Sequence, residues 1–228
     1  MRIHSRSGVL RIVVVALVLS GSLSCASTSR RTRGAVIGGA AGGVVGGLIG
    51  KHAGSTAKGA IVGAVVGGAA GAIIGHQMDM QAKELKQNIP GATVERVGEG
   101  IKVTFASGLL FGFDSAIVRG SARSNLDALA ENLDKYDDSN LMIVGHTDDV
   151  GREAYNLDLS ERRADAATRY LVVQGVARSR IGTLGVGESE PVTSNGSEEG
   201  RSRNRRIEIA IYASEAWRQQ AMREAEPS

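Results

Sequence analysis

Glycine recurs at every fourth residue in two runs of this 228-residue chain, and no other feature constrains its fold as strongly. The runs span residues 34–50 and 59–75, and together with the connector between them they hold 15 of the 31 glycines. Positions four apart on a helix share one face, so each run would present a groove of glycines flanked by Val, Ile, Leu and Ala. Each glycine costs a helix in water about 0.8–1 kcal/mol relative to alanine. Such helices therefore need a membrane or a tightly packed oligomer.

The two glycine runs are joined by a polar connector, residues 51–58, with a lysine at each end. A helix of the 17 residues in each run would be about 25 Å long, which is close to the lower limit for crossing a bilayer. The pattern predicts a helical hairpin over residues 34–75 and resembles the glycine-zipper segments of bacterial envelope proteins. A flexible linker is the alternative, but linkers are polar and Ser-rich, whereas this segment is filled with Val, Ile and Leu.

The dipeptide Gly50-Lys51 also occurs in phosphate-binding loops, but the neighbouring residues exclude such a loop here. That loop needs a glycine five residues before Gly50 and a Ser or Thr after the lysine, and this chain has Val45 and His52 there. No glycine cluster follows a predicted strand to open a dinucleotide-binding unit either. We expect no cofactor.

Residues 1–24 have the order of an export signal: basic residues, an apolar run over residues 12–19, and small residues before the single cysteine, Cys25. The apolar run is shorter than the roughly 20 residues that a spanning helix needs. With one cysteine the chain forms no internal disulfide. The segment therefore directs the chain out of the cytoplasm.

The position of Cys25 resembles the lipobox of bacterial lipoproteins, in which this thiol is acylated and becomes the new N-terminus. Ser22 and Ser24 also suit an ordinary small-x-small cleavage site. If Cys25 is acylated, Ala26 after it resembles the pattern of lipoproteins sorted to the outer membrane. Residues 25–33 would then be a short basic linker after the anchor.

The net charge of +3 does not indicate nucleic-acid binding. Arg2, Arg6 and Arg11 lie in the expected signal, and removing these three from the 27 basic residues leaves 24, against 24 acidic residues. A neutral mature chain lacks the basic field that nucleic-acid binding needs. We expect no nucleic-acid partner.

Residues 92–213 show a different pattern, a compact alternation of strands and helices that follows a linker over 76–91 and precedes a tail helix in 214–228. The expected strands are 93–97, 101–105, 141–144, 181–186 and 206–212, and the expected helices are 121–136 and 160–174, the latter capped by Ser160. The order β-α-β-α-β-β predicts an α/β fold with a mixed sheet and helices on one face. About 120 residues suffice for an independent core.

Charged and amide residues gather at the turns of this region, and the sequence there resembles the OmpA-like peptidoglycan-binding domain over roughly residues 105–212. The matching segments, in family order, are Phe111-Gly112-Phe113-Asp114-Ser115, Gly145-His146-Thr147-Asp148, residues 156–164, Gly185-Val186-Gly187-Glu188 and Asn204-Arg205-Arg206-Ile207-Glu208. An export signal, a glycine zipper and this domain together resemble the YiaD-type outer-membrane lipoproteins. The resemblance implies an outer-membrane location, facing the periplasm of a Gram-negative bacterium.

The resemblance also implies a ligand, the diaminopimelate of peptidoglycan stem peptides, whose side-chain end carries an ammonium and a carboxylate. Asp148 would bind the ammonium and Arg163 the carboxylate, which a guanidinium can contact in a bidentate way. Asn156 and Arg205 match neighbouring positions of the pocket, with Leu159 supporting it. The chain would then be a non-enzymatic tether whose partners are peptidoglycan and a membrane.

Other interpretations remain open at this point. Taken alone, Asp148 could cap a turn and Arg163 could be a solvated helix residue. His146 and Asp148 suggest a metal or an acid–base pair, but no third ligand-rich motif accompanies them, so we expect no metal and no catalytic residue and interpret His146 as a hydrogen-bonding structural residue. A periplasmic hydrolase acting on the same wall and a zipper-driven oligomer or pore are the alternative functions.

Overall fold

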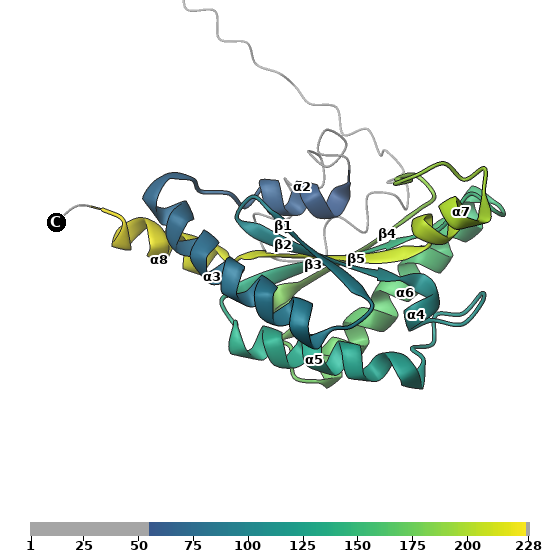
Figure 1. Cartoon of the computed structure of the whole chain (residues 1–228), viewed down its shortest axis with the longest axis horizontal. Helices are drawn as coiled ribbons and strands as arrows, with labels where there is room; N and C mark the ends of the chain where they lie inside the picture. Colours follow the sequence, from purple (N-terminus) through teal and green to yellow (C-terminus); the bar gives the residue numbers. More distant parts are fainter. Residues whose placement is uncertain (1–54, 227–228) are drawn as a thin grey trace, which may run out of the picture.

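The computed structural model describes residues 55–226, and these fold around one five-stranded mixed sheet (Figure 1). The strand order is β1-β2-β5-β3-β4. The strands are β1 (Ala92–Val97), β2 (Gly100–Ala106), β3 (Ser139–His146), β4 (Ile181–Gly187) and β5 (Arg206–Ala213). The predicted α/β class is confirmed, and the β-α-β-α-β-β order from β2 to β5 holds for the strands and long helices; the short helices α4 (Ser107–Leu110) and α7 (Glu198–Asn204) were not predicted.

The strand pairing places the C-terminal strand in the centre of the sheet. β1 and β2 form an antiparallel hairpin in which Val97 pairs with Gly100, so its loop has two residues. β5 is antiparallel to both β2 and β3. β3 and β4 are parallel, and a helix connects them, as a parallel pair requires. Every residue of β5 is buried, because the strand has neighbours on both edges and helices on both faces.

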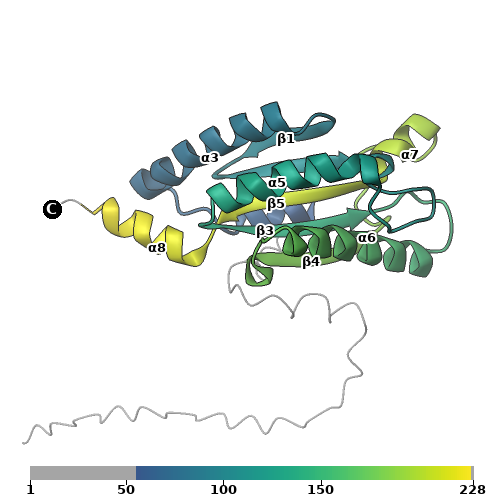
Figure 2. The same cartoon turned by 90° about the horizontal axis from the view of Figure 1, so that it is seen from below.

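Three helices cover one face of the sheet (Figure 2): α3 (Gly68–Asn88), α5 (Arg123–Lys135) and α6 (Glu153–Val173). The core between these helices and the sheet contains every second residue of the strands, since successive side chains of a strand point to opposite faces. Its members include Ile101, Val103, Phe105, Leu141, Ile143, Ile207, Ile209 and Ile211. The tail helix α8 (Glu215–Glu224) begins after the N-cap Ser214 and joins this core through Trp217 and Ala221.

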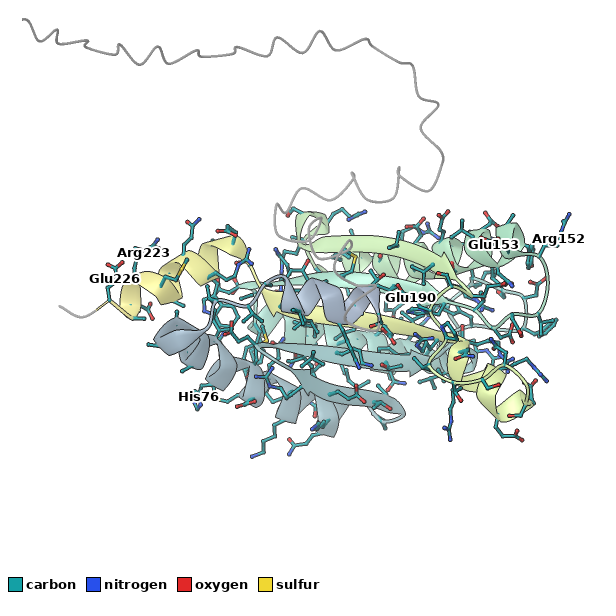
Figure 3. The ribbon with its side chains drawn as sticks, turned by 90° about the horizontal axis from the view of Figure 1, so that it is seen from above. His76, Arg152, Glu153, Glu190, Arg223 and Glu226 are labelled. Atoms are coloured by element: carbon teal, nitrogen blue, oxygen red, sulfur yellow. The ribbon has the colours of Figure 1, made fainter. Side chains whose placement is uncertain are left out.

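One short helix, α2 (Thr56–Val62), covers the opposite face of the sheet, where no helix was expected. Its buried Ala60 and Ile61 pack in one cluster with Val144 of β3 and Tyr212 of β5. Glu190, in the loop after β4, holds the start of α2: its carboxylate accepts hydrogen bonds from the Thr56 N–H at 3.0 Å and the Thr56 hydroxyl at 2.6 Å (Figure 3). Part of the second glycine run is thus built into the domain.

The second glycine run differs from the predicted single helix over 59–75, because the helix breaks between Val62 and Gly68. At the break Gly67 has φ of +73°, a conformation that glycine adopts without strain. The carboxylate of Glu99, in the β1–β2 loop, accepts hydrogen bonds from the backbone N–H of Val66 at 2.9 Å and of Gly67 at 2.8 Å. A contact from more than thirty residues away therefore replaces helical hydrogen bonds.

The residues after the break were expected to form a linker over 76–91, but α3 continues as far as Asn88. Ile74, Met78 and Leu85 give it a narrow apolar face, and all three are fully buried against the sheet. The polar Gln81 lies on the same face and donates a hydrogen bond at 3.0 Å to Asn132 of α5. Because the polar Gln81 interrupts this narrow apolar face, the sequence of residues 76–88 does not show a clear helical period.

Within residues 55–226, no helix has both the length and the apolar character that crossing a membrane requires. The expected signal at 1–24, the linker at 25–33, the anchor Cys25 and the first glycine run lie outside the described residues.

We expect Gly67→Ala to lower the free energy of unfolding by about 1–3 kcal/mol, because φ of +73° combined with ψ of 179° is a backbone conformation reserved to glycine. An added Cβ would meet no atom within 4 Å, so the cost is conformational rather than steric. Urea unfolding measures it, and hydrogen exchange of residues 56–66 locates it. Gly75→Ala is the matched control from the same repeat: it lies inside α3, and we expect a stability gain of up to about 1 kcal/mol. Equal effects of the two substitutions would contradict this account.

Candidate functional site

A cavity of about 510 Å³ lies at the end of the sheet where β3 and β4 finish and β5 begins. It is bordered by α4 (Ser107–Leu110), the first turns of α6 and α7 (Glu198–Asn204), which gather at this end in Figure 1. All the residues that the sequence assigned to peptidoglycan line this one cavity: Asp148, Asn156, Leu159, Arg163 and Arg205. The structure therefore brings together side chains from three separate segments.

Two glycines allow α6 to approach the sheet closely enough to shape this cavity. A Cβ on Gly145 of β3 would lie 2.2 Å from the Ser160 carbonyl oxygen, and one on Gly185 of β4 would lie 2.3 Å from the Glu161 nitrogen. Real Cβ atoms do not come that close, so only glycine fits at either position. The middle of α6 thus rests directly on the strand backbone, which sets the depth of Arg163 in the cavity.

The predicted N-cap at Ser160 is wrong, because α6 begins two turns earlier, at Glu153. Ser160 is fully buried; its hydroxyl donates to the Leu157 carbonyl at 2.7 Å and accepts from the Gly187 N–H at 2.9 Å. It bonds the helix to the end of β4. A polar residue at such a junction resembles a cap in sequence because both roles use the same hydroxyl.

Asp148 is held from both sides in the loop after β3. Its Oδ1 accepts a hydrogen bond from the Val150 N–H at 3.2 Å, and its Oδ2 lies 2.5 Å from Nη1 of Arg205. Nη2 of Arg205 contacts Glu198 of α7, also at 2.5 Å. Burial lowers the pKa of Arg205, but the bonds to Asp148 and Glu198 outweigh burial and raise it. Arg205 is therefore a permanent cation that orients the Asp148 carboxylate.

Arg163 lies in the middle of α6 and reaches the opposite wall of the cavity. Its Nε donates to the Ser115 carbonyl at 2.9 Å and its Nη2 to the Gly112 carbonyl at 3.5 Å, while the guanidinium lies 5.6 Å from the centre of the Phe111 ring. Burial lowers the pKa of Arg163, with the charge of Asp114 acting in the opposite direction. Its Nη1 makes no hydrogen bond to any residue in 55–226 and is free to bind a ligand.

Both charged side chains are buried, so the alternative in which Arg163 is a solvated helix residue is wrong. Asp148 is 7% exposed and Arg163 is 5% exposed. The turn after β3 is covered by Arg205 and by the first turn of α6. Both charges are thus largely removed from water. In such a buried site an ionic contact to a ligand is stronger than at a free surface.

Asn156 serves mainly to hold the walls of the cavity together. Its amide nitrogen donates to the carbonyls of Asp148 at 3.3 Å and Val150 at 3.2 Å, and to the Glu188 carboxylate at 2.6 Å. Leu159, one turn further along α6, is 7% exposed and contributes apolar wall.

Several lining residues were not assigned a role from the sequence. Ser107 and Thr147 line the cavity, and their buried hydroxyls have no hydrogen-bond partner in the described part of the chain. Glu198 and Arg201, both from α7, add one charge of each sign. Ser107 begins the four-residue α4 and Glu198 begins the seven-residue α7, and helices this short carry no apolar period, so only the folded structure shows that their residues line the cavity.

The charges around the cavity are mixed and nearly balanced. Three carboxylates and four guanidiniums line it: Asp114, Asp148, Glu198, Arg119, Arg163, Arg201 and Arg205. A lining of this kind suits a ligand that carries both signs of charge. Residues 55–226 contain no group of three or more His, Cys, Asp or Glu side chains arranged to hold a metal ion.

His146 precedes the cavity in β3 but points to the other face of the sheet. It was expected to be a hydrogen-bonding residue; however, neither ring nitrogen has a hydrogen-bond partner among the described residues, and its side chain is 0% exposed. Its Nε2 lies 3.8 Å from Glu208 Oε2. Burial, with the charges of Arg206 and Lys102, lowers the pKa of His146 well below 6.5. The imidazole is therefore neutral in the folded protein.

This burial makes stability depend on pH. Below about pH 6.5 the unfolded chain binds a proton at His146 that the folded chain does not bind, so acid favours unfolding. We expect the free energy of unfolding to fall between pH 7 and pH 5 by at most about 1.4 kcal/mol per pH unit from this residue. Urea unfolding at both pH values should show a flatter dependence for His146→Gln than for the unmodified chain, with His76→Gln as the exposed control. An unchanged pH slope in His146→Gln would contradict the assignment.

The fold and the cavity together define a cell-envelope protein built on an OmpA-like domain: the OmpA family model matches residues 110–205. The YMGG-like Gly-zipper model matches residues 5–79. More particularly, the chain joins this OmpA-like domain to a segment that matches a glycine zipper, and it lies at the outer membrane, facing the periplasm.

Two curated relatives and one solved structure show how far the similarity extends. The chain is 43% identical over 113 residues to outer membrane protein A of Bordetella avium, covering 50% of this chain and 58% of that protein. It is 34% identical over 140 residues to the probable lipoprotein YiaD of Escherichia coli K12, covering 60% of this chain and 64% of that protein. The cell wall anchor of the T6SS from Pseudomonas aeruginosa matches with a TM-score of 0.52 at 31% identity, covering 60% of this chain and 96% of that one. The chain thus spans less than two thirds of these two curated relatives.

Proposed function

We propose that the chain is a non-enzymatic tether that binds peptidoglycan through the diaminopimelate of its stem peptides and links it to the outer membrane. The observation that carries the proposal is the pairing, in one cavity, of a held carboxylate, Asp148, with a guanidinium, Arg163, that keeps a free edge. The similar solved structure is described as a cell wall anchor, which agrees with a role at the wall.

Each end of the ligand's zwitterionic group has a defined partner. A carboxylate offers about four lone-pair sites, and Asp148 uses two of them on Val150 and Arg205, so it can still accept from an ammonium. Nη1 of Arg163 can donate to the ligand carboxylate. The charge of Asp148 acts on Arg163 across the cavity, so the two groups are within electrostatic reach of one another.

Charge-assisted hydrogen bonds contribute about 1.5–3 kcal/mol each, from which ordering of the ligand subtracts. Single contacts of modest affinity suffice, because a polymer presents many repeats to an anchored domain.

The environment of the carboxylates argues against the alternative of a wall hydrolase. A general acid needs a carboxyl group whose pKa is raised, as in an apolar pocket. Here Asp148 and Glu198 both contact Arg205. The hydrogen bonds from Arg205 and Arg201 lower the pKa of Glu198, which keeps it ionised and suited to binding.

The tether is tested by incubating the purified full chain with isolated peptidoglycan sacculi. We expect it to sediment with the sacculi, to be displaced by free meso-diaminopimelate but not by lysine, which lacks the side-chain carboxylate, and to release no soluble muropeptide. Displacement by lysine at the same concentration, or failure to sediment, would overturn the recognition proposal. Release of muropeptides would show a hydrolase.

A further inference from the structure

The mouth of the cavity carries exposed apolar side chains that the tether proposal does not use. Phe113 is 100% exposed, Val150 is 63% exposed and Tyr155 is 39% exposed, and all three line the cavity. A fully exposed phenylalanine contributes nothing to the packing of its own domain. Apolar groups gathered at the edge of a cavity mark a surface that contacts something else.

The backbone beneath Phe113 is held in place although its ring is not. The loop is closed at its base by a bridge between Phe111 and Val118, and the Ser115 N–H bonds to the Gly112 carbonyl at 3.3 Å. Arg163 also donates to the Ser115 carbonyl from α6. These contacts fix the backbone of the loop, and Phe113 projects from it.

The residue after Phe113 adds a polar group beside the ring. Asp114 has φ of +53°, in the left-handed region that non-glycine residues seldom occupy. The Tyr155 hydroxyl donates to Oδ1 of Asp114, which ties the loop to the first turn of α6. The second carboxylate oxygen of Asp114 makes no hydrogen bond to any residue in 55–226. Consecutive residues at the rim thus supply an aromatic ring and a free acceptor.

We infer that Phe113, Asp114 and Tyr155 form a second subsite that binds a sugar ring of the glycan strand. The C–H face of a pyranose is apolar and packs on an aromatic ring, while its hydroxyl and amide hydrogens need acceptors such as the Asp114 carboxylate. The inference rests on the proposed function, because a stem peptide bound in the cavity is covalently attached to such a sugar.

The size of the cavity agrees with a ligand larger than one amino acid. Its volume of about 510 Å³ lies within the range of about 300–1,000 Å³ found for drug-sized ligands. A stem peptide that places diaminopimelate between Asp148 and Arg163 leaves the cavity through its mouth, where the aromatic rim lies. Contacts to the rim would then make the affinity for the intact wall higher than the affinity for the free peptide.

The test compares three ligands by calorimetry on the full chain: meso-diaminopimelate, a stem tetrapeptide, and the same tetrapeptide attached to its disaccharide. We expect the disaccharide to tighten binding to the unmodified chain by about 3- to 10-fold, the range of an aromatic contact. Phe113→Ala should abolish that gain and leave the affinities for the two sugar-free ligands unchanged, whereas Phe113→Trp should retain the gain. Ile117→Ala is the matched control, since Ile117 is 79% exposed on the same loop but does not line the cavity.

The possible results separate the two proposals. Failure of the unmodified chain to bind meso-diaminopimelate would overturn the proposed function. Normal binding of that ligand without any gain from the disaccharide would overturn the sugar subsite alone. An equal loss of tetrapeptide and disaccharide binding in Phe113→Ala would show that the ring contacts peptide, and this result would also overturn the subsite.

Discussion

Asp148→Ala is expected to weaken binding of meso-diaminopimelate by about 10- to 150-fold. Among the described residues that line the cavity, Asp148 carries the only carboxylate that is both buried and held by an arginine. A charge-assisted hydrogen bond contributes about 1.5–3 kcal/mol, and each 1.4 kcal/mol corresponds to a factor of about ten. Calorimetric titration measures the change, and sedimentation with sacculi should fall in parallel.

The stability of this variant needs its own measurement, because Asp148 is buried and pairs with Arg205. Arg205 keeps Glu198 as a partner and has a side chain that is 32% exposed, so we expect the variant to remain folded. Asp148→Asn tests the charge alone, because the amide oxygen can still accept the Val150 N–H. Asp149→Asn is the control, as Asp149 is the next residue and is exposed. Unaltered binding by a folded Asp148→Ala would remove Asp148 from the site.

Arg163→Ala is less easily interpreted, and the structure shows why. The guanidinium both faces the cavity and holds the loop carbonyls of Gly112 and Ser115. Its loss would therefore remove a ligand contact and disturb the loop that carries Phe113. Asp148 gives the cleaner measure of recognition.

Glu208→Gln is expected to have the largest effect on stability, lowering the free energy of unfolding by about 3–5 kcal/mol. Glu208 lies in the central strand with 1% of its side chain exposed, 2.8 Å from Nε of Arg206 and 3.9 Å from Nζ of Lys102. Removing its charge leaves two largely buried cations without their shared anion. At about 2–4 °C per kcal/mol for a chain of this size, the melting temperature should fall by about 6–20 °C.

The control for this substitution is Glu95→Gln. Glu95 also contacts Lys102, at 3.1 Å, but its side chain is 48% exposed, and exposed ion pairs contribute at most about 1 kcal/mol. Thermal unfolding followed by circular dichroism compares the two variants. Equal shifts in melting temperature would show that the buried network on the α2 side of the sheet does not stabilise the fold.

Most of the OmpA-like domain was predictable because its signals are local or follow an ordered pattern. The strands expected over 101–105 and 206–212 correspond to β2 and β5, and the tail helix expected in 214–228 corresponds to α8. The site residues came from matching segments in family order, and the fold brings them to one cavity. Their roles as ligand contacts stay a prediction.

Three of the errors share one physical cause, since each depends on a residue far away in the chain. α2 and the break at Gly67 depend on Glu190 and Glu99, which supply carboxylates to backbone groups of the second glycine run. α6 starts well before Ser160 because that hydroxyl bonds to β4 instead of capping a helix. Local propensity carries no information about such partners.

The sequence alone determined the order of the strands and long helices, the identity of the charged residues at the turns, and the resemblance to a family of envelope proteins. Only the tertiary structure decided that Asp148 and Arg163 are buried, that Arg205 holds the aspartate, and that Phe113 remains fully exposed at the rim. Burial and pairing are properties of what surrounds a side chain, and those surroundings come from segments that meet only when the sheet is assembled.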